Sequence, residues 1–225
     1  MPFHSPRILA HRGASGHALE NSLAAFAAAR KLGADGVELD VHATADGILL
    51  VHHGAEIPGR GAIAELTGGK LATLVLSNGE PIPTLPQALQ ELAGLEVWIE
   101  VKALPASADR ALLAAIDGAP TPDRLAVHSF DHRIVARLGA LRPALHRGIL
   151  STSYPLDQSG PMVAAGATAL WQEYRLIDTE LVAAIHRRGG EVVAWTVNDA
   201  ATARELGALG VDALCGNYPE RLHLS

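Results

Sequence analysis

Hydrophobic positions along the chain alternate between short β-rich runs and longer Ala- and Leu-rich segments of helical length. The eight β-rich runs are Arg7–His11, Gly36–Val41, Val97–Val101, Arg124–Ser129, His146–Leu150, Thr168–Trp171, Glu191–Val197 and Val211–Cys215. Strands that alternate with helices predict a parallel sheet with right-handed crossovers. Eight such units close into a (β/α)8 barrel, the TIM barrel. An open doubly wound sheet is the alternative, but no Gly-x-Gly-x-x-Gly motif follows the first strand.

Several helices have recognisable ends in the sequence. The polar run Glu20-Asn21-Ser22 precedes an Ala-rich segment that ends at Gly33. Asp178 and Asp199 each precede a helical pattern, and the first of these two patterns ends at Gly189-Gly190. Ser and Asp side chains cap the free N–H groups of a helix start, and Gly accommodates the left-handed residue after a helix end. We therefore expect helices to begin directly after these polar residues.

One segment interrupts the alternation. Asp46-Gly47 is a turn signal after the second strand, and Ile48–His52 then has the pattern of an extra strand. Residues 54–83 follow, rich in Gly and Pro and without an aromatic residue, and we interpret them as a small insertion over the barrel mouth. No linker marks a domain boundary, so residues 1–225 are expected to form one barrel domain.

Composition narrows the class of protein. The 225 residues are 48% hydrophobic, which is enough for a sizeable core and excludes disorder as the main state. The net charge of −6, without a basic patch, disfavours binding to nucleic acid or to an anionic membrane. The single cysteine, Cys215, excludes an intrachain disulfide. No signal peptide or spanning apolar run is visible, so we expect a cytoplasmic protein without a membrane anchor, of open oligomeric state.

The second strand carries two carboxylates. Glu38 and Asp40 are two residues apart, so they lie on one face of the strand, which in a barrel is the interior. Two buried carboxylates repel each other and are costly to desolvate. A divalent cation removes both penalties, and oxygen ligands suit Mg²⁺ or Ca²⁺.

Neighbouring strands end in further reactive residues. Glu100 on the third strand would be a third carboxylate for the same metal ion, and Lys102 would lie higher, where its charge suits an anionic substrate. The first strand ends in His11-Arg12. After the extra strand, alternation lets only one residue of His52-His53 point inward. His42 continues the face of the two carboxylates, but we expect it just beyond the strand.

Each feature also has a purely structural interpretation. Glu38 and Asp40 could be a solvated or helix-facing pair, Glu100 and Lys102 an ordinary ion pair, and His11 a polar residue with its hydrogen bonds satisfied. Their joint occurrence at the carboxyl ends of three successive strands is what indicates a site, because functional side chains of such barrels gather there.

These motifs resemble the glycerophosphodiester phosphodiesterase family. The resemblance covers essentially the whole chain, in order, through His11-Arg12-Gly13, Glu20-Asn21-Ser22, the run 33–41, Asp46-Gly47, His53, Ile82-Pro83-Thr84-Leu85, Glu100-Val101-Lys102, Ser129-Phe130, Trp195-Thr196-Val197-Asn198 and Gly210-Val211-Asp212. It implies a (β/α)8 fold and metal-dependent hydrolysis of glycerophosphodiesters to glycerol 3-phosphate and an alcohol. It also implies roles for single residues: metal ligands Glu38, Asp40 and Glu100; general acid/base His11 and His53; phosphate contacts Arg12 and Lys102; and Trp195 near the glycerol.

The chain departs from the family pattern at three places. Leu19 replaces a proline, and Gly54 replaces the acidic residue after the second catalytic histidine. The closing segment Cys215-Gly216-Asn217-Tyr218-Pro219 differs from the usual Thr-Asp-x-Pro, which could alter substrate preference. Two rival functions stay open: a lyso-type phospholipase D on the same barrel, which would need an apolar surface near the mouth, and a barrel that binds phosphorylated ligands without turnover.

Overall fold

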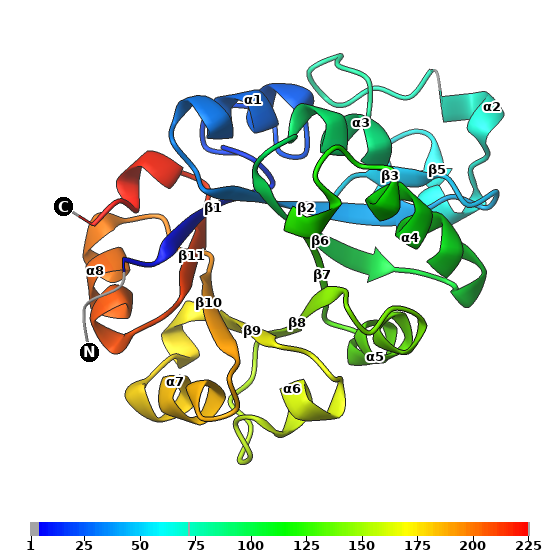
Figure 1. The fold of residues 1–225 in the computed structure, drawn as a ribbon. Coiled ribbons are helices and arrows are strands. Elements are labelled where there is room, and N and C mark those ends of the chain that lie inside the picture. The colour runs from blue at the N-terminus through cyan, green and yellow to red at the C-terminus, as the bar shows by residue number, and fades with distance from the viewer. Residues whose placement is uncertain (1–4, 72, 225) are drawn as a thin grey trace.

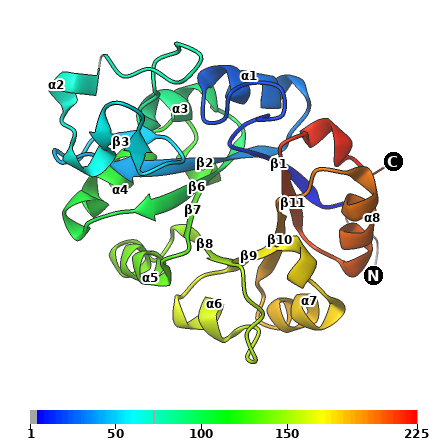
Figure 2. The ribbon, with the colours of Figure 1, turned by 180° about the vertical axis from the view of Figure 1, so that it is seen from behind.

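Eight parallel strands surround a central axis in the computed structural model, which describes residues 5–71 and 73–224 (Figures 1 and 2). They are β1 (Arg7–His11), β2 (Gly36–Ala43), β6 (Glu96–Ala103), β7 (Leu125–Ser129), β8 (His146–Ser151), β9 (Ala169–Glu173), β10 (Glu191–Trp195) and β11 (Ala213–Gly216). Each strand pairs with the next along the chain, and β11 pairs with β1. The predicted closed (β/α)8 barrel is confirmed.

Helices lie outside the strands in both views (Figures 1 and 2). They are α1 (Leu23–Lys31), α3 (Leu85–Glu91), α4 (Asp109–Asp117), α5 (His132–Leu141), α6 (Gly160–Ala164), α7 (Thr179–His186) and α8 (Ala200–Leu209). The expected caps form: Ser22, Asp178 and Asp199 accept hydrogen bonds from N–H groups in the first turns of α1, α7 and α8. Helix α8 is followed by Gly210, whose φ of 88° lies in the left-handed region.

Strand ends differ from the sequence prediction by a few residues. Strand β2 continues to Ala43 because the antiparallel β3 (Leu49–Val51) pairs with its last three residues. Strand β9 continues to Glu173 through pairing with β10, which itself ends at Trp195. These ends depend on partners that are distant in sequence, which a local pattern does not contain.

The segment 54–83 forms a small unit beside β3 (Figure 1). It contains the hairpin β4 (Glu56–Ile57) and β5 (Gly61–Ala62), and the short helix α2 (Gly68–Leu71). Residue 72 of this predicted insertion lies outside the described residues. A buried apolar cluster joins the segment to Leu50 of β3; its members from the segment are Ile57, Ile63, Leu66, Leu74, Leu76 and Ile82. This packing holds the segment against β3.

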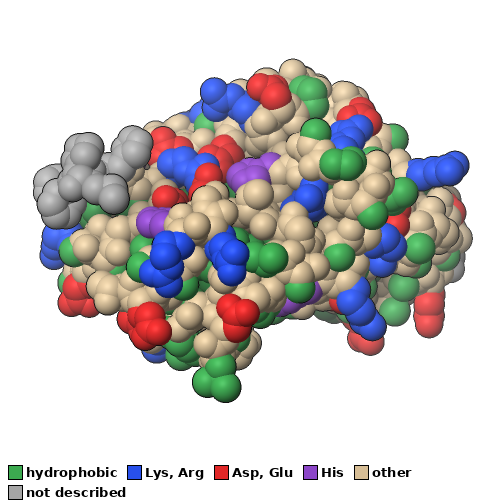
Figure 3. Space-filling view, turned by 60° about the horizontal axis from the view of Figure 1, so that its bottom comes forward, with side chains coloured by type: hydrophobic (Ala, Val, Ile, Leu, Met, Phe, Trp, Pro, Cys, Tyr) green, Lys and Arg blue, Asp and Glu red, His purple; other side chains and the backbone are tan. Residues whose placement is uncertain are grey.

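Apolar side chains fill much of the barrel interior. The polar interior side chains lie near the carboxyl ends of the strands. The interior cluster consists of Leu9, Trp98, Ala126, Leu150, Ala169, Trp171, Val193, Ala213 and Cys215. Outside, acidic and basic side chains are interspersed over the face that Figure 3 shows. Within residues 5–71 and 73–224, no helix is both long and apolar enough to span a membrane.

Candidate active site

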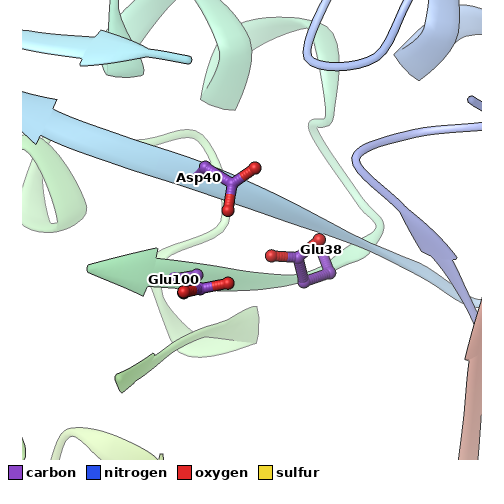
Figure 4. Close-up of side chains that lie close together, drawn as sticks. All are labelled: Glu38, Asp40 and Glu100. Carbon is purple, nitrogen blue, oxygen red and sulfur yellow. The ribbon is translucent and has the colours of Figure 1, made fainter. Parts of the chain in front are cut away.

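Three carboxylates meet at the carboxyl end of the barrel. Glu38 and Asp40 project from β2 and Glu100 from β6, and Figure 4 shows their carboxylates pointing toward one another. One oxygen from each lies within 4.8 Å of the others, and all three residues are buried. Asp40 and Glu100 are direct partners in the register of β2 and β6. The two-residue spacing and the parallel register thus bring the three predicted metal ligands together.

Burial and mutual repulsion dominate the electrostatics of these carboxylates. Burial first, and then the charge of Asp40, raise the pKa of Glu38 to about 7. Burial and the charge of Glu38 raise the pKa of Glu100 to about 7 as well. Burial alone would also raise the pKa of Asp40, but the Lys102 ammonium and the Arg12 guanidinium lower it below its usual 3.8. Near neutral pH, a further positive charge would therefore stabilise the ionised form of these carboxyls.

Two cations already contact the cluster. Lys102 places its Nζ 2.9 Å from Asp40 Oδ1 and 2.7 Å from Glu100 Oε1. Arg12 places its Nε 3.2 Å from Asp40 Oδ2 and donates from Nη1 to Glu20 Oε2 at 2.8 Å. Lys102, which was expected higher on the strand than Glu100, thus also contacts the carboxylates. Both cations still line the cavity that the carboxylates face.

His11 is held by the last loop of the barrel. Its Nδ1 lies 2.8 Å from Oδ1 of Asn217, and its Nε2 lies 4.0 Å from Glu38 Oε2. The Asn217 N–H donates in turn to Oδ1 of Asn198 at 2.8 Å. When Pro219 is aligned with the proline of the Thr-Asp-x-Pro pattern, Asn217 takes the place of its acidic residue. This departure therefore lies directly on the partner of His11.

His53 points toward the same cavity, whereas His52 turns away. The side chain of His53 is 45% exposed, and its Nδ1 lies 3.9 Å from Glu20 Oε1. Burial, followed by the charge of Arg12, lowers the pKa of His53 below its usual 6.5. The Nδ1–H of His52 instead faces the carbonyl of Gly54 at 2.8 Å. Glu20 thus supplies a carboxylate near His53, although Gly54 offers none.

His42 does not join the carboxylates. The register of β2 with β6 shifts at this point: Val41 pairs with Val101 but His42 pairs with Ala103, so the register skips one residue of β6. The expectation that His42 lies just beyond the strand is wrong, because it is part of β2. Its Nε2–H donates to the backbone carbonyl of His53 at 3.1 Å, so this histidine supports the loop that carries His53.

One cavity of about 150 Å³ unites most of these groups. Among the residues that line it are these site residues expected from the sequence: His11, Arg12, Glu38, His53, Glu100, Lys102 and Trp195. Asp40 lies behind them with no exposed surface. Trp195 packs edge-on against Phe130, with their ring centroids 5.6 Å apart. The structure thus places the eight predicted site residues in or directly behind one cavity.

The donor set fits a divalent cation. Glu38 Oε1 is buried and has no hydrogen-bond partner within the described part of the chain. Burying an oxygen without a hydrogen-bond partner costs free energy. The two neighbouring carboxyls with pKa values near 7 are likewise costly to ionise in this buried site. Three convergent carboxylates are ligands of the kind that Mg²⁺ and Ca²⁺ accept.

Four further polar residues contact the site and had no predicted role. Asn21 and Glu20 belong to a motif recognised in the sequence. Their contacts, of Asn21 with Asp40 and of Glu20 with Arg12, depend on the path of the loop after β1, which a local pattern does not predict. His128 is buried in β7 and also lines the cavity. It follows an apolar run within a predicted strand, so its place on the interior face could have been inferred from alternation alone. Asn217 is the fourth.

Comparisons with known proteins agree with this arrangement. The family described as "Glycerophosphoryl diester phosphodiesterase family" matches residues 11–221. A glycerophosphodiester phosphodiesterase of Caldanaerobacter subterraneus subsp. tengcongensis is 30% identical over 231 residues, which cover 96% of this chain and 95% of the relative. The crystal structure of a glycerophosphodiester phosphodiesterase from Parabacteroides distasonis is 28% identical, with a TM-score of 0.87 and coverage of 97% and 95% of the two chains. An Oleispira antarctica phosphodiesterase in complex with the product sn-glycerol-3-phosphate is 27% identical, with a TM-score of 0.87 and coverage of 96% and 95%.

Proposed function

The chain belongs to the glycerophosphoryl diester phosphodiesterase family and is an enzyme of that class, and from this premise we propose that it hydrolyses glycerophosphodiesters to glycerol 3-phosphate and an alcohol by metal-dependent acid/base catalysis. The observation that carries the proposal is the meeting of three buried carboxylates, two histidines and two cations at one cavity. A barrel that merely binds a phosphorylated ligand has no need of two histidines beside a buried acidic cluster.

Glu38, Asp40 and Glu100 would hold one divalent cation, Mg²⁺ or Ca²⁺. When bound, such an ion supplies positive charge to the phosphoryl oxygens and lowers the pKa of a hydroxyl or water that it contacts. The pKa of about 7 that Glu38 and Glu100 each have without an ion supports this assignment, because only a cation lets both ionise at low cost.

Arg12 and Lys102 would contact the phosphate. Both line the cavity, and both now contact Asp40. A diester anion offers each of them a second acceptor, and charge-assisted hydrogen bonds to phosphate are strong. Trp195 would form the wall beside the glycerol, where its ring and Phe130 provide an apolar surface.

His53 and His11 would be the acid/base pair. Because burial and Arg12 lower the pKa of His53, this ring is neutral at pH 7 and suited to accept the proton of the attacking hydroxyl. His11 would donate a proton to the leaving alkoxide from Nε2, which is the nitrogen that faces the cavity because Asn217 engages Nδ1. Glu20 would help to orient both His53 and Arg12.

Small deacylated diesters would be the preferred substrates. A second cavity of about 400 Å³ shares His53 with the first and is lined in part by the segment 54–83. Its aliphatic walls include Ile57 and Val75, which is the feature that favours a lysolipid substrate. Against this, Glu56 also lines the cavity, and none of its lining residues in the described part of the chain is Trp, Tyr or Phe. We therefore expect a higher kcat/KM for glycerophosphocholine than for a lysophospholipid.

The direct test is the release of glycerol 3-phosphate from glycerophosphocholine, with and without EDTA. We expect EDTA to abolish turnover and an excess of divalent cation to restore it. Glu100→Gln removes one ligand charge with little change in shape and should lose most activity, whereas Glu80→Gln, at a partly exposed carboxylate of the segment 54–83, should retain it. Full activity of the Glu100→Gln variant, or of the EDTA-treated enzyme, would contradict the proposal.

A further inference from the structure

His128 stands out among the buried polar residues of the barrel. It lies on β7, is 1% exposed, and lines the cavity of the candidate active site. Neither of its ring nitrogens has a hydrogen-bond partner within residues 5–71 and 73–224. Buried polar groups in folded proteins are almost always hydrogen-bonded or bound to an ion, so an imidazole with two unpartnered nitrogens requires an explanation.

A buried oxygen that also has no partner lies close to His128. Nε2 of His128 lies 3.8 Å from Oε1 of Glu38, and Glu38 Oε1 is buried without a hydrogen bond. This separation is too long for a hydrogen bond. It is shorter than the sum of two metal–ligand bonds of about 2.1 Å each, so one ion can contact both atoms.

The strand register places His128 at the level of the carboxylates. Glu100 on β6 is the register partner of His128 on β7, and it is also the partner of Asp40 on β2. Three adjacent strands therefore present a carboxylate, a carboxylate and an imidazole in one row across the barrel interior. The imidazole extends the acidic cluster by one strand.

The surroundings of His128 keep its ring in place. The ring centroid lies 4.2 Å from that of Trp171 and 5.5 Å from that of Trp98, so two large side chains confine it. Imidazole is a common metal ligand in proteins, and a confined ring loses little conformational freedom when it binds an ion.

We propose that His128 supplies a nitrogen ligand to the cation held by Glu38, Asp40 and Glu100, and that the site consequently selects a divalent transition-metal ion such as Mn²⁺ over Mg²⁺ or Ca²⁺. Imidazole nitrogen is a good ligand for transition metals, whereas Mg²⁺ and Ca²⁺ take oxygen ligands almost exclusively. The inference rests on the metal site of the proposed function, and it replaces the all-oxygen ligand set with a mixed one.

The first test uses the unaltered protein, so it does not depend on how a variant folds. Pulsed electron paramagnetic resonance of the Mn²⁺-loaded enzyme should show modulation from a directly bound imidazole ¹⁴N. Uniform labelling with ¹⁵N-histidine should replace that signal with the corresponding ¹⁵N coupling. Bound Mn²⁺ without a coupled histidine nitrogen would overturn this inference and leave the carboxylate site standing. No Mn²⁺ binding at all would overturn both this inference and the metal site.

The second test measures metal affinity by titration calorimetry. His128→Gln should weaken Mn²⁺ binding by about tenfold or more and remove the nitrogen coupling, while Mg²⁺ affinity changes much less. His146→Gln is the matched control, because His146 also packs against Trp98, at 4.8 Å between ring centroids, and does not line the cavity. Unchanged Mn²⁺ affinity in His128→Gln, with weaker binding of glycerol 3-phosphate, would overturn the inference and make His128 a phosphate contact.

Discussion

Asn21 and Asp40 hold each other through two reciprocal hydrogen bonds. Nδ2 of Asn21 donates to Oδ2 of Asp40 at 2.7 Å, and the N–H of Asp40 donates to Oδ1 of Asn21 at 3.2 Å. Asn21 is 1% exposed and has a φ of 58°, a left-handed conformation that asparagine tolerates better than most residues. The pair ties the loop after β1 to the middle of β2 and fixes the orientation of a proposed metal ligand.

Replacing Asn21 should therefore weaken metal binding without touching a ligand. Asn21→Gly keeps the positive φ at low cost and removes only the side chain, and we expect metal affinity to fall about tenfold. Asn21→Ala should show the same loss of affinity and be about 1 kcal/mol less stable than Asn21→Gly, because alanine is strained in the left-handed conformation and glycine is not. Calorimetric titration and urea unfolding separate the two effects. Unchanged metal affinity in Asn21→Gly would show that Asp40 does not depend on this pair.

The sequence predicts the barrel well because its signals are local. Alternating side chains identify the strands, and capping residues such as Ser22 and Asp199 identify helix starts, without any knowledge of neighbours. Strand ends are different. Ala43 belongs to β2 only because β3 pairs with it, and Glu173 belongs to β9 through β10. Such ends are set by tertiary pairing, which local patterns do not contain.

The same distinction applies to the site. Glu38 and Asp40 are recognisable from their spacing on one strand, and Glu100 from the same pattern on the next. The contact between His11 and Asn217 joins residues 206 positions apart through closure of the barrel, so no local pattern reveals it. His128 shows the intermediate case, because alternation places it inside the barrel but only the register with Glu100 brings it to the site.

Metal binding should depend on pH through Glu38 and Glu100. Their pKa values of about 7, raised by burial and mutual repulsion, mean that an ion must displace protons below pH 7. Affinity should therefore fall as pH drops from 8 to 6. Calorimetry in buffers of different ionisation enthalpy should show proton release of about one or more per ion at pH 6 and little at pH 8. Affinity that does not change with pH would contradict the raised pKa values.

The same pKa shifts determine whether the metal-free protein gains or loses stability as pH rises. A carboxyl with a folded pKa near 7 binds more protons in the folded state than in the unfolded state between pH 4.5 and 7. These two groups therefore lower the free energy of unfolding as pH rises through this range, and saturating metal should remove that loss. Urea unfolding at pH 5 and pH 8, with and without metal, provides the check.

The two histidines should differ in their response to the leaving group. Without His11, hydrolysis of glycerophosphocholine should fall by about 10²- to 10⁴-fold, while a nitrophenyl diester, whose leaving group needs no proton, should be affected far less. His53→Ala should impair both substrates. His52→Ala is the matched control, because that ring turns to the Gly54 carbonyl, and it should keep activity on both. A near-normal rate on glycerophosphocholine in the His11→Ala or His53→Ala variant would exclude an acid/base role for that residue.

Arg7 should contribute stability at the opposite end of the barrel. Its Nη1 donates to both oxygens of Glu96 at 2.9 Å, and it also pairs with Glu191, so it joins β1, β6 and β10. Arg7→Met leaves two carboxylates without their cation and should lower the free energy of unfolding by about 2 kcal/mol. The loss is smaller than for a fully buried ion pair because the Arg7 side chain is a third exposed. Arg133→Met, at an exposed pair with Asp131, should change little. Equal destabilisation of both variants in urea unfolding would contradict this role.

Asn217→Asp should change the pH dependence of catalysis through His11. The amide oxygen of Asn217 now accepts from Nδ1 of His11 without adding charge, whereas an aspartate at that distance would stabilise the protonated ring. If His11 donates the proton to the leaving alcohol, the alkaline limb of kcat/KM for glycerophosphocholine should move up by about one pH unit, and the acid limb should stay in place.

Asn217→Ala, which removes the partner without adding charge, should lower kcat and leave the alkaline limb at or below its original pH. A nitrophenyl diester should not report the shift, because its leaving group needs no proton. Movement of the acid limb instead would assign His11 as the base, and an unmoved profile would show that the ring does not transfer the proton.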